Sequence, residues 1–549
     1  MPDPTTTADL VLTGGPVHTG APARSRATSV AVRGERVVAV GHDEVRELIG
    51  PRTEVVELAG KLLVPGFQDA HAHPVGGGLE MGQCDLSGAT TLPEYRETIT
   101  AYARAHGDAE WITGGGWAME AFPGGLPTAA ELDALVPDRP VYLVNRDHHG
   151  AWVNSRALER AGLDARTPDP VDGRIERHPD GSPTGMLQEG AANLVGRLVP
   201  AVTREERVAG LLRAQALLHS LGVTAWQDAL LGEHANLSDP TDAYLACADD
   251  GTLTARVVGA LWWDRARGTE QIEELLARRV AGTRGRLRST TVKIMQDGVA
   301  ENGTAALLGP YLDGCGCVSD NSGISFVPPE DLKKYVTELD AHGFQVHFHA
   351  LGDRAVREAL DAVEAARRAN GWTGTRPHLA HLQVVHPDDV GRFRALGATA
   401  NIQPLWAAHE PQMDDLTIPF LGAERAGWQY PFGALLRSGA TLAAGSDWPV
   451  SSPDPLQGIH VAVNRVAPDA PAGTPVFLPG ERIGLLDALT AYTAGSAYVN
   501  HLDHETGTVA EGFLADLVVL DRDPFAGPPE EIGATRVEQT FVGGRRVFG

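Results

Sequence analysis

Short apolar runs alternate with amphipathic stretches through the middle of the chain. The apolar runs occupy residues 222–229, 291–298, 344–352, 378–385, 398–404 and 440–450. Residues 353–370, which follow one of these runs, have the apolar spacing of an amphipathic helix. Regular alternation of strands with helices predicts an α/β fold built on a parallel sheet. The number of such units favours closure of that sheet into a (β/α)8 TIM-like barrel.

Both ends of the chain have a different pattern. Residues 1–62 and 496–549 alternate apolar and polar positions between glycine turns, as in "SVAVRGERVVAVG" and "VEQTFVGGRRVFG". This alternation predicts β-hairpins, and we expect the two ends to build one β-sandwich domain. The expected barrel occupies residues 63–495 between them. Residues 75–215 interrupt its rhythm, so they are predicted to form an insertion after barrel strand 1.

Charge and composition argue against several classes of protein. The chain has 549 residues and a net charge of −25, with no basic stripe, so a nucleic-acid partner is not expected. No apolar run reaches the roughly 18 residues of a membrane span, and the start "MPDPTTTADL" does not resemble a signal peptide. The four cysteines are too few for a disulfide framework, which favours a cytoplasmic protein. A homodimer is the commonest symmetric assembly.

The segment "PGFQDAHAHP", residues 65–74, carries the strongest chemical signal. His71 and His73 are two residues apart, and side chains with this spacing point to the same side of a strand. Both imidazoles would face one point at the carboxyl end of the strand, where barrel active sites lie. Imidazole suits zinc and other late divalent metals. The pair therefore predicts a metal site, although His-x-His pairs also arise by chance.

Further groups that can bind metals stand at other expected strand ends. They are His347, His349, His378, His381, His386 and Asp447. His347 and His349 repeat the two-residue spacing. A single strand histidine is more often a core residue, and we expect His378 and His386 to cap a helix or face solvent. One such group can be explained by a structural role. The same explanation is weaker when several strand ends each carry a group that can bind a metal.

One charged residue interrupts an apolar run. In "TVKIMQDG", residues 291–298, Lys293 stands in the middle of an expected buried strand. Burying an ammonium group without a partner is costly. The amine must therefore reach water, pair with Asp297 or Asp228, or be chemically changed. The pattern by itself leaves these alternatives open.

Taken together, these motifs resemble the metal-dependent amidohydrolase superfamily. The similarity covers nearly the whole chain, from "GKLLVPGFQDAHAH" to "GTVAEGFLADLVVLD" and "VEQTFVGGRRVF". The segments "HHGAWVNSRAL", "GSPTGMLQEGA", "HALGDRAV" and "GSDWPV" resemble the amidohydrolase 3 branch, which has a large insertion after the first strand. The segment "VKIMQDGVAEN" is similar to N-substituted formamide deformylases of that branch.

The resemblance implies a site for one or two divalent ions, with Zn2+ as the expected metal. Asp447 would bind the first ion and act as the catalytic proton shuttle. Lys293 would be carboxylated by CO2, and its carbamate would bridge the two ions. The implied metal ligands are His71, His73, Lys293, His349, His381 and Asp447.

The implied reaction is hydrolysis of a non-peptide C–N bond in a small amide by a metal-activated hydroxide. An N-substituted formamide, which would give formate and an amine, is one such substrate. A cyclic amide, an ester or a deaminable ring on the same scaffold is an alternative, and so is a scaffold protein without catalysis. Glu189 is also a candidate acidic ligand. Candidate substrate contacts, each with a structural alternative, are Trp117, His149, Asn154, Glu189 and His347.

Overall fold

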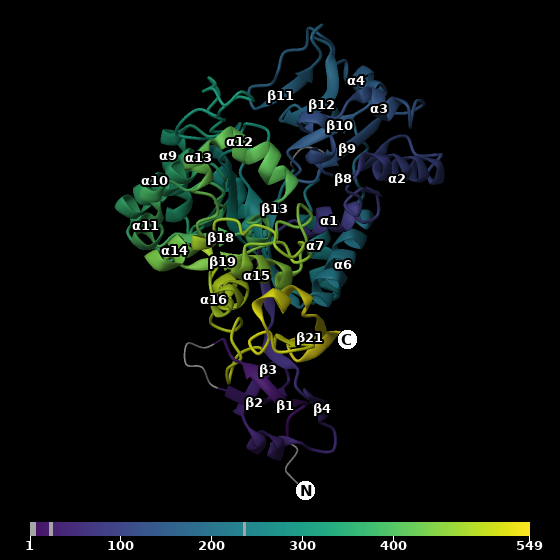
Figure 1. Ribbon diagram of the computed structural model, residues 1–549. Coiled ribbons are helices and arrows are strands. Elements are labelled where there is room, and N and C mark those ends of the chain that lie inside the picture. Colours follow the sequence, from purple (N-terminus) through teal and green to yellow (C-terminus); the bar gives the residue numbers. More distant parts are fainter. Residues whose placement is uncertain (1–6, 21–25, 234–237) are drawn as a thin grey trace.

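The structure is a computed structural model that describes residues 7–20, 26–233 and 238–549 (Figure 1). The strands of this part of the chain form three sheets. Residues 1–6 and 21–25 of the predicted N-terminal domain lie outside the described residues. Within the described ranges, no helix is long and apolar enough to cross a membrane.

A parallel sheet of eight strands occupies the centre of the molecule. Its strands, in sheet order, are β19 (Leu442–Ala444), β18 (Thr399–Ile402), β17 (His378–His381), β16 (Gln345–Ala350), β15 (Leu287–Met295), β14 (Arg256–Trp262), β13 (Val223–Leu231) and β6 (Phe67–Ala72). The two edges meet where Asp447 N donates to His71 O and His73 N donates to Trp448 O, both at 2.8 Å. The sheet is therefore nearly closed, which agrees with the predicted TIM-like barrel.

Close contact between the two edges depends on Gly445. A β carbon at this position would lie 2.6 Å from His71 N and 3.0 Å from Asp69 Oδ1, which is too near for a side chain. Asp69 also joins the edges, because Oδ1 accepts from His71 N at 2.9 Å and Oδ2 accepts from Ser446 Oγ at 2.5 Å. These contacts hold the loop that carries Asp447 against the first barrel strand.

Helices cover the outside of the barrel (Figure 1). The helix expected over residues 353–370 is α10 (Asp353–Asn370), which buries Ala355, Val356, Ala359 and Val363 on one face. This spacing of three and four residues places the apolar side chains against the sheet. The other long helices of the barrel are α6 (Arg204–Ser220), α7 (Thr241–Asp250), α8 (Ile272–Ala281), α9 (Pro329–Ala341), α11 (Pro387–Leu396) and α15 (Pro455–Asn464).

A second sheet lies between barrel strands β6 and β13 in the sequence, within the predicted insertion. Its strands, in sheet order, are β11 (Gly173–Arg177), β12 (Pro183–Glu189), β10 (Gly150–Val153), β9 (Val141–Asn145), β8 (Ile112–Trp117) and β7 (Cys84–Asp85). It is accompanied by helices α2 (Leu92–Ala105) and α4 (Ser155–Ala161). Trp117, Phe122 and Trp152 pack edge to face in its own apolar core.

The third sheet joins both ends of the chain, at the end of the barrel opposite the insertion (Figure 1). Its strands, in sheet order, are β22 (Arg545–Phe548), β21 (Val537–Val542), β20 (Leu517–Leu520), β5 (Leu62–Pro65), β1 (Leu10–His18), β2 (Arg26–Arg33) and β3 (Arg36–Gly41), and β4 (Glu54–Glu57) pairs with β1. Antiparallel pairing of β20 with β5 connects the two ends directly. The sandwich form of this domain stays a prediction.

Candidate metal centre

The carboxyl ends of five barrel strands converge on one small cavity. The strands are β6, β15, β16, β17 and β19, and parallel strands present their carboxyl ends at the same edge of a barrel. The cavity has a volume of about 120 Å³. Its lining includes all six expected ligands, namely His71, His73, Lys293, His349, His381 and Asp447.

Asp447 lies at the centre of this group. Its Oδ1 is 3.0 Å from His71 Nε2 and 3.1 Å from His73 Nε2. Its Oδ2 is 3.9 Å from His381 Nδ1. Ligand atoms of His71, His381 and Asp447 all lie within 4.8 Å of one another, which is the spacing of a site able to hold a metal ion.

A chain of buried amides begins below the site and ends on His71. Gln345 Nε2 donates to the carbonyl oxygens of Arg376 at 2.9 Å and Val499 at 2.8 Å. A carbonyl oxygen can only accept, so the orientation of the Gln345 amide is set and its Oε1 is an acceptor. Gln227 Nε2 donates to this oxygen at 3.2 Å. The amide of Gln227 therefore presents Oε1, its acceptor, to the histidines above it.

This orientation determines which nitrogen of His71 carries the proton. His347 Nδ1 donates to Gln227 Oε1 at 2.7 Å, so His347 Nε2 is an acceptor, and His71 Nδ1 donates a hydrogen bond to it at 2.8 Å. The remaining nitrogen, His71 Nε2, then presents a lone pair to the carboxylate of Asp447, 3.0 Å away. Burial, together with the charge of Lys293, lowers the pKa of His71 to about 3, so protonation does not relieve the contact. A metal cation fits between these two acceptors.

His381 also has ring nitrogens that a metal would satisfy, and His349 has a carboxylate beside its Nδ1. Within the described residues, neither nitrogen of His381 has a hydrogen-bond partner although both are buried. His349 Nδ1 lies 3.3 Å from Asp297 Oδ1 without forming a hydrogen bond. Burial holds the pKa of each imidazole well below its usual range, so both rings are neutral and able to ligate. A carboxylate behind a histidine is the usual second partner of a metal ligand.

Lys293 is a buried amine that neither reaches water nor pairs with Asp228 or Asp297. Its side chain does not reach water, since it is only 3% exposed. Asp228 accepts from Tyr244 Oη at 2.6 Å, and Asp297 accepts from three backbone amides, so neither pairs with the lysine. Lys293 Nζ lies 3.5 Å from His71 Nε2. Burial, partly offset by Asp447, lowers the pKa of Lys293 to about 7, and the neutral amine is therefore well populated at neutral pH.

His149 and Glu189 form a hydrogen-bonded pair on the wall of the same cavity. His149 Nδ1 donates to both carboxylate oxygens of Glu189, at 2.9 and 3.0 Å, and Thr304 Oγ1 donates to Glu189 at 2.7 Å. Burial lowers the pKa of His149, but the attraction of Glu189 outweighs it and raises the pKa to about 9. His149 is therefore an imidazolium beside the centre. Glu189 therefore holds this imidazole, and its predicted role as an acidic ligand or a substrate contact stays a prediction.

Three predicted substrate contacts do not reach the cavity. Trp117 is fully buried in the core of the insertion, and its Nε1 donates to Leu143 O at 3.0 Å. Asn154 caps helix α4, where its Oδ1 accepts from Ala157 N at 3.0 Å. His347 is fully buried beneath His71. None of the three lines the metal cavity, and each side chain is held by a structural partner, so the structure does not bring them to the site.

The remaining histidines have structural positions. His386 caps helix α11, as expected, with Asp388 N donating to its Nδ1 at 3.2 Å. His378 was expected to cap a helix or face solvent, and this was wrong. It is fully buried and its Nε2 donates to Gln227 Oε1 at 3.0 Å. The sequence reasoning also missed Gln227 and Gln345, since an amide in a strand carries no signal of its own.

Several residues of the site have strained backbone. The φ angles of Glu189, His381 and Asp447 are 51°, 80° and 57°, in the left-handed region that non-glycine residues rarely adopt. Such conformations cost about 1–3 kcal/mol each and persist where the surrounding structure enforces them, which is common at functional sites. The strain is therefore further support for a functional centre at this place.

Comparisons with known proteins agree with the geometry. A family model described as "Amidohydrolase family" matches residues 54–548. The chain is 34% identical to "Protein LONG AFTER FAR-RED 3" of Arabidopsis thaliana, over 98% of this chain and 92% of that protein. It is 28% identical to "N-substituted formamide deformylase" of Arthrobacter pascens, over 98% and 97% of the two chains. An uncharacterized metal-dependent hydrolase from Pyrococcus horikoshii OT3 superposes with a TM-score of 0.72 at 27% identity, covering 95% and 99% of the two chains.

Proposed function

Because the chain belongs to the amidohydrolase family, we propose that it is a metal-dependent hydrolase that cleaves a non-peptide C–N bond in a small amide. The observation that carries this proposal is the unprotonated His71 Nε2 facing Asp447 across 3.0 Å in a buried cavity. Two lone pairs that face each other at this distance need a cation between them. Imidazole nitrogen and carboxylate oxygen are both ligands that Zn2+ binds.

Six side chains would hold one or two Zn2+ ions, and Lys293 would take part as a carbamate. Its neutral amine would attack CO2, forming an N–C bond and releasing one proton, and the product would be an anion with two oxygen donors. This change also removes the cost of a buried ammonium. The proposed ligands are His71, His73, Lys293, His349, His381 and Asp447.

A divalent ion bound there would lower the pKa of water and polarise a substrate carbonyl. Asp447 would move the proton. Burial raises the pKa of this carboxyl, but His71, His73 and His381 outweigh burial and hold it well below its usual range, so it is ionised. Its Oδ1 already faces His71 and His73, whereas Oδ2 lies farther from its nearest histidine. We assign proton transfer from water to the leaving nitrogen to Oδ2.

His149 would stabilise the oxygen of the reacting carbonyl. Its Nδ1 is bonded to Glu189, so Nε2 is the nitrogen able to donate to a ligand in the cavity. A positively charged donor beside a developing oxyanion is most effective where water is excluded. Glu189 keeps the ring charged and oriented, which makes it a positioning residue.

The size of the cavity supports a small acyl group, and formyl is the smallest. The metal cavity has a volume of about 120 Å³, whereas the adjoining cavity has about 490 Å³. The formyl group would lie at the metal and the amine portion in the larger space. Similarity to an N-substituted formamide deformylase supports the same reaction, which yields formate and an amine.

A substrate panel with purified, Zn2+-loaded protein and bicarbonate tests this function. We expect release of amine from N-benzylformamide, slower release from N-benzylacetamide, and loss of both activities with a chelator. Hydrolysis confined to cyclic amides, esters or adenine would replace the linear-amide assignment. Protein that contains metal yet hydrolyses none of these compounds would favour a scaffold without catalysis.

A further inference from the structure

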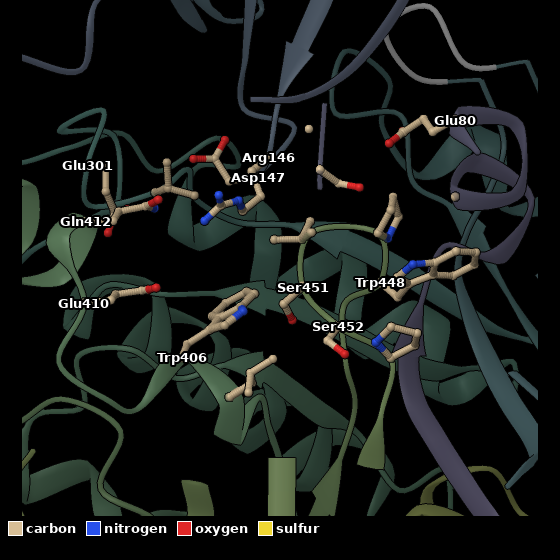
Figure 2. A pocket seen from close by; sticks show the side chains of 18 of the residues that line it. Glu80, Arg146, Asp147, Glu301, Trp406, Glu410, Gln412, Trp448, Ser451 and Ser452 are labelled. Carbon is tan, nitrogen blue, oxygen red and sulfur yellow. The ribbon is translucent and has the colours of Figure 1, made fainter. Parts of the chain in front are cut away.

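A second, larger cavity lies beside the metal cavity, and Figure 2 shows the side chains that line it. Its volume is about 490 Å³. Asp147, Pro449 and Val450 line both cavities, so the two spaces adjoin at a shared wall. A substrate with its scissile bond at the metal would place its remaining portion here, and the side chains of this space therefore select among substrates.

The lining of this cavity is strongly acidic. It contains one cationic side chain, Arg146, against five carboxylates. Arg146 is paired with Glu120 at 3.4 Å, and Glu80 is paired with His148 at 3.2 Å. Among the residues that the structure describes, the other carboxylates form no ion pair, and these are Asp85, Asp147, Glu301 and Glu410.

The carboxylates are not spread evenly around the wall. Figure 2 shows Glu301, Gln412 and Glu410 along one side of the cavity and Trp448 on the opposite side. Trp406 also lines the cavity. Indole faces attract cations by about 0.5–2 kcal/mol. Carboxylates together with indole rings are the groups that bind an ammonium or guanidinium ion.

Gln383 gives an independent indication of the same ligand. This residue lines the cavity and is 2% exposed. Its Nε2 lies at the hydrogen-bonding limit from Gln429 Oε1, at 3.5 Å, and within the described chain its Oε1 has no partner at all. A buried carbonyl oxygen without a donor is costly. An N–H donor from a bound ligand would satisfy it.

We propose, on the basis of the amide hydrolysis described above, that the natural substrate is an acylated diamine. Its second amine, protonated at neutral pH, would lie in the larger cavity against Glu301 and Glu410 and donate to Gln383. Hydrolysis adds water across the C–N bond and gives a carboxylate and the free diamine. Burial raises the pKa of Glu301 and raises the pKa of Glu410 to about 7, so a bound cation would favour their ionised forms and an anionic amide would not.

Three formamides of matched length test this assignment. They are mono-N-formylcadaverine, N-formylhexylamine and N-formylaminohexanoate, which end in an ammonium, a methyl and a carboxylate group. We expect kcat/KM for the ammonium compound to exceed that of the methyl compound about 10-fold or more, with the carboxylate compound the poorest. A preference for the methyl or the carboxylate compound would overturn the proposal.

Charge-removing variants connect the preference to the cavity. Glu301→Gln and Glu410→Gln should each reduce the ratio of kcat/KM for the ammonium over the methyl compound. Glu273→Gln is the matched control, because Glu273 is exposed on α8, forms no ion pair among the described residues and lies outside the cavity lining. An unchanged ratio in both cavity variants would also overturn the proposal.

Binding without turnover separates this inference from the proposed function. Calorimetry with hexylammonium, hexanol and hexanoate on the metal-loaded protein should show tightest binding of the cation. Cation binding without hydrolysis of any formamide would retain the cationic subsite and reject amide hydrolysis. Tighter binding of hexanol or hexanoate would reject the subsite, even if formamides are hydrolysed.

Discussion

Replacement of His347 by leucine tests how the protein prepares His71 for metal binding. His347 Nε2 accepts from His71 Nδ1 at 2.8 Å, and leucine offers no acceptor. The proton of His71 would then move to Nε2, where Asp447 Oδ1 lies 3.0 Å away and can accept it. This tautomer has no lone pair on Nε2, so metal binding must first reverse the change.

The cost follows from the burial of His71. In the metal-bound state of His347→Leu, the proton returns to Nδ1, where it has no acceptor. A buried, unsatisfied N–H group costs about 1–3 kcal/mol, and about 1.4 kcal/mol corresponds to a tenfold change in affinity. We therefore expect metal affinity to fall about 5- to 150-fold. Mutation of residues that hydrogen-bond to metal ligands typically lowers metal affinity or activity by about 10- to 100-fold. The loss expected here covers the same range.

Competition with a chromophoric chelator measures the affinities for Zn2+ and Co2+. His378→Leu is the matched control, because it removes an imidazole that also donates to Gln227 Oε1, at 3.0 Å, but forms no hydrogen bond with His71. Denaturant unfolding of the metal-free variants measures the structural cost of each change. An unchanged affinity in His347→Leu, or an equal loss in His378→Leu, would refute the reasoning.

Lys293→Ala should lose metal and activity, with partial rescue by short carboxylic acids, and full activity in this variant would exclude the carbamate. Asp447→Asn should keep its unfolding midpoint but lose turnover about 10²- to 10⁴-fold at saturating metal, as expected for a lost proton shuttle; near-normal turnover would remove Asp447 from the mechanism. The neutral fraction of Lys293 rises with pH through its pKa of about 7. Incorporation of isotope-labelled bicarbonate into Lys293 should therefore increase as the pH is raised from slightly acidic to slightly alkaline, and a flat profile would contradict this assignment.

The barrel could be predicted because buried parallel strands leave a simple pattern. Apolar runs such as the one that contains β15 alternate with amphipathic stretches such as α10, and this alternation survives without knowledge of tertiary contacts. The predicted insertion is an interruption of that rhythm in the sequence. Its internal sheet was not predicted, since its strands are short and its core forms from residues far apart in sequence.

The grouping of candidate ligands followed from topology. His71 and His349 lie on different strands and Asp447 follows a third, and carboxyl ends of parallel strands meet at one edge of a barrel. The residues beneath them could not be found in this way. Gln227 and Gln345 look like ordinary polar residues in a sequence, and only their cross-strand contacts show that they orient His71 through His347.

The predicted substrate contacts that lie outside the cavity share one physical cause. Trp117 and Asn154 stand in motifs that resemble the family, but a motif does not distinguish a residue that holds the insertion together from one that meets substrate. Trp117 fills an apolar core and Asn154 caps a helix. Glu301 and Glu410 were missed for the opposite reason, because they lie on separate loops that only the fold brings to one cavity.

The central claim is that this protein hydrolyses a small amide with a bound divalent metal. The most direct measurement is amine release from N-benzylformamide by purified protein whose metal content is quantified in the same sample. We predict activity in proportion to bound metal, abolished by a chelator and restored by Zn2+ with bicarbonate. Full metal occupancy without any amine release, or undiminished release after complete metal removal, would contradict the account.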